Sequence, residues 1–245
     1  MRIPRIFTQQ PLSAETTIEL EPGPSQHLSR ALRMQAGAEL VVFDGSGGEY
    51  PAVIDVVGKK RVSVILGEHR AVNRESPLPV HLGIAVSRGE RMDWVMQKAT
   101  ELGAKDITPL FTERTEVRLK GERADKKVAH WQQITISASE QCGRNQPPTV
   151  HPIQQLDEWM SNQAAPLKLI LHHRADALPA SEDRPSAITL LVGPEGGLST
   201  AEIERAESQE FLSLALGQRI LRTETAPLAA LAILQSRWGD MALAD

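Results

Sequence analysis

The chain has 245 residues, 41% of them hydrophobic and 24% charged, which is the composition of an ordinary soluble globular protein. Its single cysteine, Cys142, excludes an internal disulfide framework, and no apolar run reaches the roughly 20 residues that span a bilayer. The N-terminus lacks the apolar segment of a signal peptide, so we expect a cytoplasmic protein.

The formal net charge of −4 gives no global nucleic-acid signature, but the charge is unevenly distributed. Residues 151–245 carry 7 Lys and Arg against 13 Asp and Glu, whereas residues 81–150 carry 11 against 9. Residues 1–80 carry 9 of each. An RNA partner would therefore have to be bound by local basic patches on the first two-thirds of the chain.

The N-terminal part has the pattern of a small β-barrel. Alternating apolar residues predict strands at 39–43, 50–56 and 61–66. The glycine-rich stretch 44–48 predicts a hairpin between the first two strands. A short helix is predicted at 25–35, ending at Gly37.

The polar stretch 72–79 carries two prolines and marks a domain boundary. We therefore predict a β-barrel domain over 1–72 and an α/β domain over 73–245. Apolar strands are predicted in the second domain at 80–86, 107–111, 167–171, 188–192 and 212–216. Helices are predicted between and after them at 88–103, 124–138 and 227–238. Strands that alternate with helices indicate a largely parallel sheet covered on both faces.

Two segments follow predicted strands and could bind a ligand. Residues 193–197, Gly-Pro-Glu-Gly-Gly, join a buried strand to a helix opened by a predicted capping box of Ser199 and Glu202. Gly196 and Gly197 would let a ligand approach the main chain, and open α/β sheets bind ligands where strands end. A tight turn without a ligand is the alternative.

The second segment, residues 216–226, places Ile220 and Leu221 between Arg219 and Arg222. It leads into a helix that is apolar on nearly all sides, which we expect to be buried on every face, in the core or at a subunit interface. The apolar loop is then expected to be partly buried as well. A loop that merely packs well is the alternative.

Several common sites are excluded. The sequence has no phosphate-binding loop, no Gly-x-Gly-x-x-Gly after the first α/β strand and no serine-hydrolase elbow. Its histidines lack the spacing of metal ligands, so we expect no metal. A row of basic residues could bind phosphates, although a solvated surface is the alternative. This row comprises Arg2, Arg5, His27, Arg30, Arg33, Arg114, Arg118 and Arg144.

At these motifs the chain resembles the RsmE family, SPOUT-class RNA methyltransferases that modify ring nitrogen 3 of a uridine in 16S ribosomal RNA. The resemblance rests on residues 1–7, 27–33, 97–103, 140–144, 193–197 and 216–226. It implies an α/β domain with a C-terminal trefoil knot, an N-terminal PUA-like barrel, bound S-adenosylmethionine and a homodimer acting on the small ribosomal subunit.

The resemblance also implies roles for individual residues. The catalytic candidates are Arg144, Glu195, Arg222 and Glu224. The basic row above supplies the RNA-binding candidates. The cofactor contacts would be Leu171, His172, Gly193, Pro194, Glu195, Gly196, Gly197, Leu216, Gly217, Ile220, Leu221, Arg222, Thr223 and Ala226.

Three alternatives stay open. The chain could methylate another RNA such as a transfer RNA, or it could be a non-catalytic RNA-binding protein with the same fold. An enzyme acting on nucleotide phosphates is a third alternative, for which the sequence offers no phosphate loop. The sequence leaves open whether the substrate is free RNA or an assembled subunit, and which group is the general base.

Overall fold

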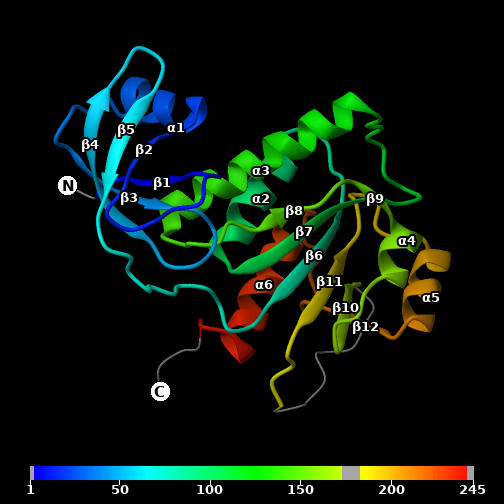
Figure 1. The fold of residues 1–245 in the computed structure, drawn as a ribbon. Helices are drawn as coiled ribbons and strands as arrows, with labels where there is room; N and C mark the ends of the chain where they lie inside the picture. The colour runs from blue at the N-terminus through cyan, green and yellow to red at the C-terminus, as the bar shows by residue number, and fades with distance from the viewer. Residues whose placement is uncertain (1–2, 173–182, 242–245) are drawn as a thin grey trace. The chain divides into compact units, whose positions relative to one another are not determined.

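The computed structural model describes residues 3–172 and 183–241 (Figure 1). The chain divides into two compact units. Unit 1 comprises Met1–Glu75 and Ser139–Pro147, and unit 2 comprises Ser76–Ala138 and Pro148–Asp245. The long helix α3, Glu122–Cys142, thus contributes its last residues to unit 1.

Unit 1 contains a five-stranded sheet with the order β1-β3-β4-β5-β2. Its strands are β1 Arg5–Phe7, β2 Thr17–Glu19, β3 Glu39–Phe43, β4 Tyr50–Val57 and β5 Val62–Leu66. Only the β1–β3 pair is parallel. Alternate apolar residues of these strands, including Ile6, Val42, Ile54 and Val64, are fully buried, so the period-two pattern explains the fold of this unit. The three predicted strands and the hairpin are confirmed.

The predicted helix 25–35 is wrong in its position and length. The structure has α1 at Pro22–Gln26, opened by proline, followed by a π-helical turn, η1, at His27–Ala31. The Leu32 amide bonds the His27 carbonyl at 3.0 Å, and Arg33 adopts a left-handed conformation with φ of 52°. The wider turn ends the helix early, so that Leu28 is buried but Leu32 is exposed.

Unit 2 is built on a parallel sheet of seven strands with the order β12-β10-β11-β6-β7-β8, and β9 also pairs with β7. The strands are β6 Val80–Ala85, β7 Ala104–Phe111, β8 Thr149–Val150, β9 Gln154–Gln155, β10 Leu167–Leu171, β11 Ile188–Val192 and β12 Phe211–Leu214. The predicted parallel sheet is confirmed. The C-terminal knot stays an expectation from the resemblance, and residues 173–182, between β10 and β11, lie outside the described residues.

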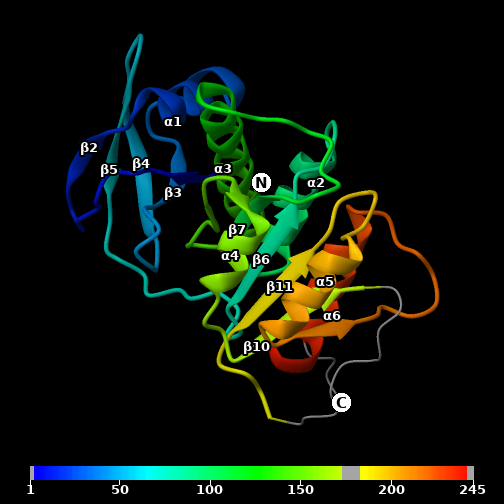
Figure 2. The same cartoon turned by 90° about the vertical axis from the view of Figure 1, so that its right-hand side faces the viewer.

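Helices cover both faces of this sheet (Figures 1 and 2). One face packs against α2 Arg91–Glu101, α3 and α6 Thr225–Trp238, in a core that includes Met96, Trp131 and Leu231. The other face packs against α4 Leu156–Ser161 and α5 Thr200–Ser208, around Trp159 and Phe211. Within the described residues no helix is long and apolar enough to cross a membrane.

The core of a single chain does not bury α6 on every face, and the alternative predicted for this helix, burial at a subunit interface, stays a prediction. Leu231 and Leu234 are fully buried, but Ile233 on the opposite face is 42% exposed. A helix in a two-layer packing presents only one stripe to the sheet, so its remaining apolar residues reach the surface of the chain.

Candidate functional site

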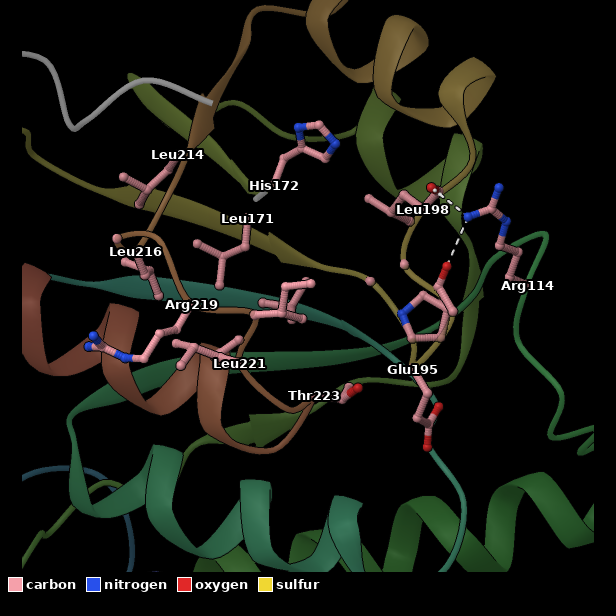
Figure 3. A pocket seen from close by; sticks show the side chains of 18 residues that line it. Arg114, Leu171, His172, Glu195, Leu198, Leu214, Leu216, Arg219, Leu221 and Thr223 are labelled. Atoms are coloured by element: carbon pink, nitrogen blue, oxygen red, sulfur yellow. Dashed lines mark hydrogen bonds between the residues drawn. The ribbon is translucent and has the colours of Figure 1, made fainter. Parts of the chain in front are cut away.

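A pocket of about 300 Å³ lies at the carboxyl ends of β10, β11 and β12 (Figure 3). Because these strands are parallel, their last residues, Leu171, Val192 and Leu214, meet at one edge of the sheet and line the pocket together. The loops that follow the strands supply the rest of its wall.

The glycine turn after β11 brings main-chain groups to the pocket. A Cβ on Gly193 would lie 2.9 Å from the Leu198 Cγ atom, so only glycine fits there. Gly197 has a φ of +65°, and its amide donates to the Pro194 carbonyl at 2.8 Å. The predicted capping box after the turn is confirmed, with Ser199 and Glu202 bonding each other's amides at 3.2 and 2.8 Å.

Arg114, from the loop after β7, holds this turn in place. Its Nη1 donates to the Gly196 carbonyl at 2.8 Å and the Leu198 carbonyl at 3.3 Å, as the dashed lines in Figure 3 show. The neighbouring Glu113 amide donates to the Glu202 carboxylate at 2.7 Å. The sequence predicted RNA contact for Arg114, and the structure places this side chain against the main chain of the pocket.

The opposite wall is apolar. The side chains of Leu171, Leu216 and Leu221 form this wall and are labelled in Figure 3. Gly217 turns the chain there with a φ of +81°. The expectation of a partly buried loop holds for Leu221 but is wrong for Ile220, which is 84% exposed.

Charged groups lie at the edge of the pocket. The Glu195 carboxylate accepts hydrogen bonds from the Arg91 Nη1 at 2.6 Å and from the Arg88 amide at 3.3 Å. Burial raises the pKa of Glu195, but hydrogen bonds to its own amide, to Arg91 and to Arg88 outweigh that effect and lower the pKa below its ordinary value. Glu224, at the start of α6, lies 3.7 Å from the Arg91 Nε.

The structure brings the expected cofactor contacts together. All of them except Arg222 line this one pocket, and Arg222 is exposed on the same loop. The sequence did not single out Val192, Leu198, Leu214 and Arg219 as pocket residues. Their position at strand ends and inside the two loops was the signal that could have found them.

The lining suits S-adenosylmethionine. Leucine side chains offer an apolar slot of the kind that an adenine ring prefers, while the glycine turn offers main-chain donors and acceptors to polar edges. The lining also includes the oppositely charged side chains of Arg219 and Glu195. Among the described residues, no three His, Cys, Asp or Glu side chains gather as metal ligands.

Two of the basic candidates in unit 1 are buried in ion pairs. Arg5 donates to Glu49 at 2.5 Å and also to Asn145. Arg144 bonds Glu75 through its Nε at 2.7 Å and its Nη2 at 2.6 Å, with 8% of its side chain exposed. These guanidinium groups are bonded to carboxylates inside the unit, which gives each of them a structural role.

The remaining basic candidates within the described residues are exposed. His27, Arg30 and Arg33 are exposed on or after η1 in unit 1, and Arg118 is exposed in unit 2. Arg33 lies beyond the end of η1, with a φ of 52°. Arg2 lies outside the described residues.

Comparison with known proteins gives two domain matches. Residues 74–235 match the family model of the RNA methyltransferase domain, and residues 25–67 match that of the RNA methyltransferase PUA domain. Ribosomal RNA small subunit methyltransferase E of Buchnera aphidicola subsp. Schizaphis graminum is 34% identical over 242 residues, which cover 98% of each chain. The Bacillus subtilis protein of the same name is 31% identical over 238 residues, 93% of each chain.

Solved structures are similar over nearly the whole chain. A methyltransferase of Legionella pneumophila in complex with SAM is 43% identical with a TM-score of 0.95, over 98% of this chain and 100% of that one. Ribosomal RNA small subunit methyltransferase E of Neisseria gonorrhoeae bound to S-adenosyl methionine is 40% identical, with a TM-score of 0.93 and the same coverage. The expected fold class, a SPOUT α/β domain with an N-terminal PUA-like barrel, is confirmed.

Proposed function

Because the chain belongs to the ribosomal RNA small subunit methyltransferase E family, we propose that it methylates ring nitrogen 3 of a uridine in 16S ribosomal RNA. S-adenosylmethionine is the proposed methyl donor, since two relatives at least 40% identical were solved with it. The observation that carries the proposal is the single pocket built from residues 193–197 and 216–226 at the end of the sheet.

The pocket residues would hold and orient the cofactor. Leu171, Leu216 and Leu221 would enclose its apolar part, and the main chain of 193–197 would bond its polar edges. The cofactor, when bound, supplies a methyl group activated by a sulfonium centre. Transfer from such a donor depends on in-line positioning, which is what a rigid turn held by Arg114 provides.

The acceptor nitrogen carries a weakly acidic proton. Either a base removes this proton, or a cation stabilises the anion that its loss creates. Glu195 and Glu224 are the proposed bases, and the ion pair with Arg91 keeps Glu195 ionised but weakens it as a base. Arg222 is exposed beside the pocket and is the proposed cation for the uridine anion. Arg144 would take part only if it left Glu75.

A homodimer in the cytoplasm belongs to the same proposal. Ile220 and Ile233 expose apolar side chains on the cofactor loop and on α6, where a second copy would cover them. Light scattering of the purified chain tests this point, and a monomer at micromolar concentration would contradict it.

The decisive experiment is transfer of labelled methyl from S-adenosylmethionine to small ribosomal subunits that lack the modification, followed by nucleoside mass spectrometry. One 3-methyluridine per subunit is expected. Free 16S RNA run in parallel distinguishes naked RNA from the assembled particle. Label only in transfer RNA would favour the alternative substrate, and failure to bind S-adenosylmethionine would favour a non-catalytic RNA-binding protein.

A further inference from the structure

Arg91 is the first residue of α2. It contacts both of the loops that we call the cofactor loops, residues 193–197 and residues 216–226. Its Nη1 lies 2.6 Å from Glu195 in the glycine turn, and its Nε lies 3.7 Å from Glu224 at the start of α6. The two carboxylates come from segments that are separate in sequence and that form opposite parts of the pocket wall. One guanidinium therefore joins the two loops between which the cofactor is expected.

The surroundings of Arg91 favour a fixed position. Glu90 precedes it as the N-cap of α2, and Gly89 has a φ of +65° that turns the chain out of β6. The Arg88 amide bonds the same Glu195 oxygen at 3.3 Å, while the Arg88 side chain pairs with Glu116 at 2.7 Å. The segment that carries Arg91 is thus attached to Glu116 by an ion pair and to Glu195 by the Arg88 amide.

Without the guanidinium, the two loops would present like charges to each other. Glu195 and Glu224 would repel, and the glycine turn would lose its contact with Arg91 while it keeps those with Arg114 and the Arg88 amide. Arginine can bond two carboxylates through different nitrogens, whereas lysine offers a single point charge. The geometry therefore requires arginine more strongly than a positive charge alone would.

We propose that Arg91 is a positioning residue that sets the separation of the two cofactor loops by a hydrogen bond to Glu195 on one and an ion pair with Glu224 on the other. It acts through these carboxylates and does not touch the reacting atoms. This inference rests on the proposed function for the identity of the ligand, S-adenosylmethionine, while the clamp itself is a property of the chain.

The test compares Arg91→Ala and Arg91→Lys with Arg123→Ala, which removes an exposed arginine from α3. Cofactor affinity is measured by calorimetry with S-adenosylmethionine. Exposed ion pairs contribute modestly, so Arg91→Ala is expected to weaken binding about fivefold and Arg91→Lys about twofold. Arg123→Ala is expected to bind like the parent chain, and equal affinity of Arg91→Ala and Arg123→Ala would overturn the proposal.

A double-mutant cycle separates positioning from loss of charge. If Arg91 acts through the carboxylates, Arg91→Ala costs little further affinity when Glu195→Gln and Glu224→Gln are already present. An undiminished effect in that background would contradict the clamp. The KM for S-adenosylmethionine is expected to rise in Arg91→Ala in step with the dissociation constant, and an unchanged KM would contradict the clamp.

Hydrogen exchange of the cofactor-free protein keeps this inference apart from the proposed function. Arg91→Ala is expected to speed exchange of the Gly197 and Leu198 amides, and Arg123→Ala is not. This readout needs no methyl transfer. If the parent chain fails to methylate any RNA but the exchange difference is present, the clamp stands and the proposed activity falls.

Discussion

Arginine–carboxylate pairs occur in both units of this protein, but they differ in burial and in what they join. In unit 1, Arg5 and Arg144 are more than nine-tenths buried and join the N-terminal strand and the end of α3 to their surroundings. In unit 2, Arg91 is 39% exposed and joins two loops at the edge of a pocket. The same chemistry therefore stabilises a fold in one place and shapes a binding site in the other.

This difference decides how the basic residues should be assigned. If a buried guanidinium leaves its carboxylate, an unpaired charge remains in the interior. This lowers the stability of the fold far more than breaking an exposed ion pair does. Burial raises the pKa of Glu49, but hydrogen bonds from Arg74 and Arg5 lower it below its ordinary value. The exposed residues His27 and Arg30 are consequently better placed to meet phosphates than Arg5 or Arg144.

The largest expected effect is that of Arg144→Ala. It leaves the Glu75 carboxylate without its main partner in a buried setting, so the free energy of unfolding is expected to fall by about 3 kcal/mol. Chemical denaturation measures the change, with the exposed Arg30→Ala as the matched control. Normal stability together with lost methylation would instead make Arg144 a functional residue.

The half-buried His81 tests whether polar side chains inside unit 2 also contribute to the stability of the fold. Burial lowers the pKa of His81 to about 4, although Asp106 acts to raise it, and the ring bonds Thr108 at 2.7 Å. Because the unfolded chain binds the proton near pH 6.5, stability is expected to fall from there to pH 4 and then level off, by about 3 kcal/mol at most.

The measurement is the free energy of unfolding as a function of pH for the parent chain and for His81→Gln, whose amide can still reach Thr108. The variant is expected to lose the step between pH 6.5 and 4. Retention of that step in the variant would assign it to another group.

Two glycines in the two units give a third contrast. A Cβ at Gly193 would meet Leu198 at 2.9 Å, whereas a Cβ at Gly23 would meet nothing within 4 Å. Gly193→Ala must move the turn, and we expect it to weaken S-adenosylmethionine binding about tenfold. Gly23→Ala should leave calorimetric affinity unchanged. If Gly193→Ala and Gly23→Ala bind S-adenosylmethionine with equal affinity, the turn does not shape the cofactor site.

The smallest effect is expected at the exposed basic residues of unit 1. Arg30→Ala should leave stability unchanged and weaken RNA binding modestly. If Arg30 meets one phosphate, the slope of log affinity against log salt concentration should shrink by about 1. An unchanged slope would remove Arg30 from the RNA-binding surface.

The strands and the turns that follow them could be predicted from the sequence, because they depend on the pattern of neighbouring residues. Period-two alternation predicted the strands of unit 1, and apolar runs predicted β6, β10 and β11 close to their observed bounds. Glycines after two of those runs predicted the pocket loops, because parallel strands end at one edge of the sheet. Helix ends were less certain, since α2 begins at Arg91 rather than 88.

The ion-pair partners of the charged side chains, and the exposure of the apolar ones, could be found only in the folded structure. Arg144 and Glu75 are 69 residues apart in the chain, and nothing local to either residue indicates their pairing. Arg91 meets Glu195 across 104 positions, and Ile220 is exposed while its neighbour Leu221 is half-buried. Pairing and burial depend on which distant segments the fold brings together, whereas periodicity is written in adjacent residues.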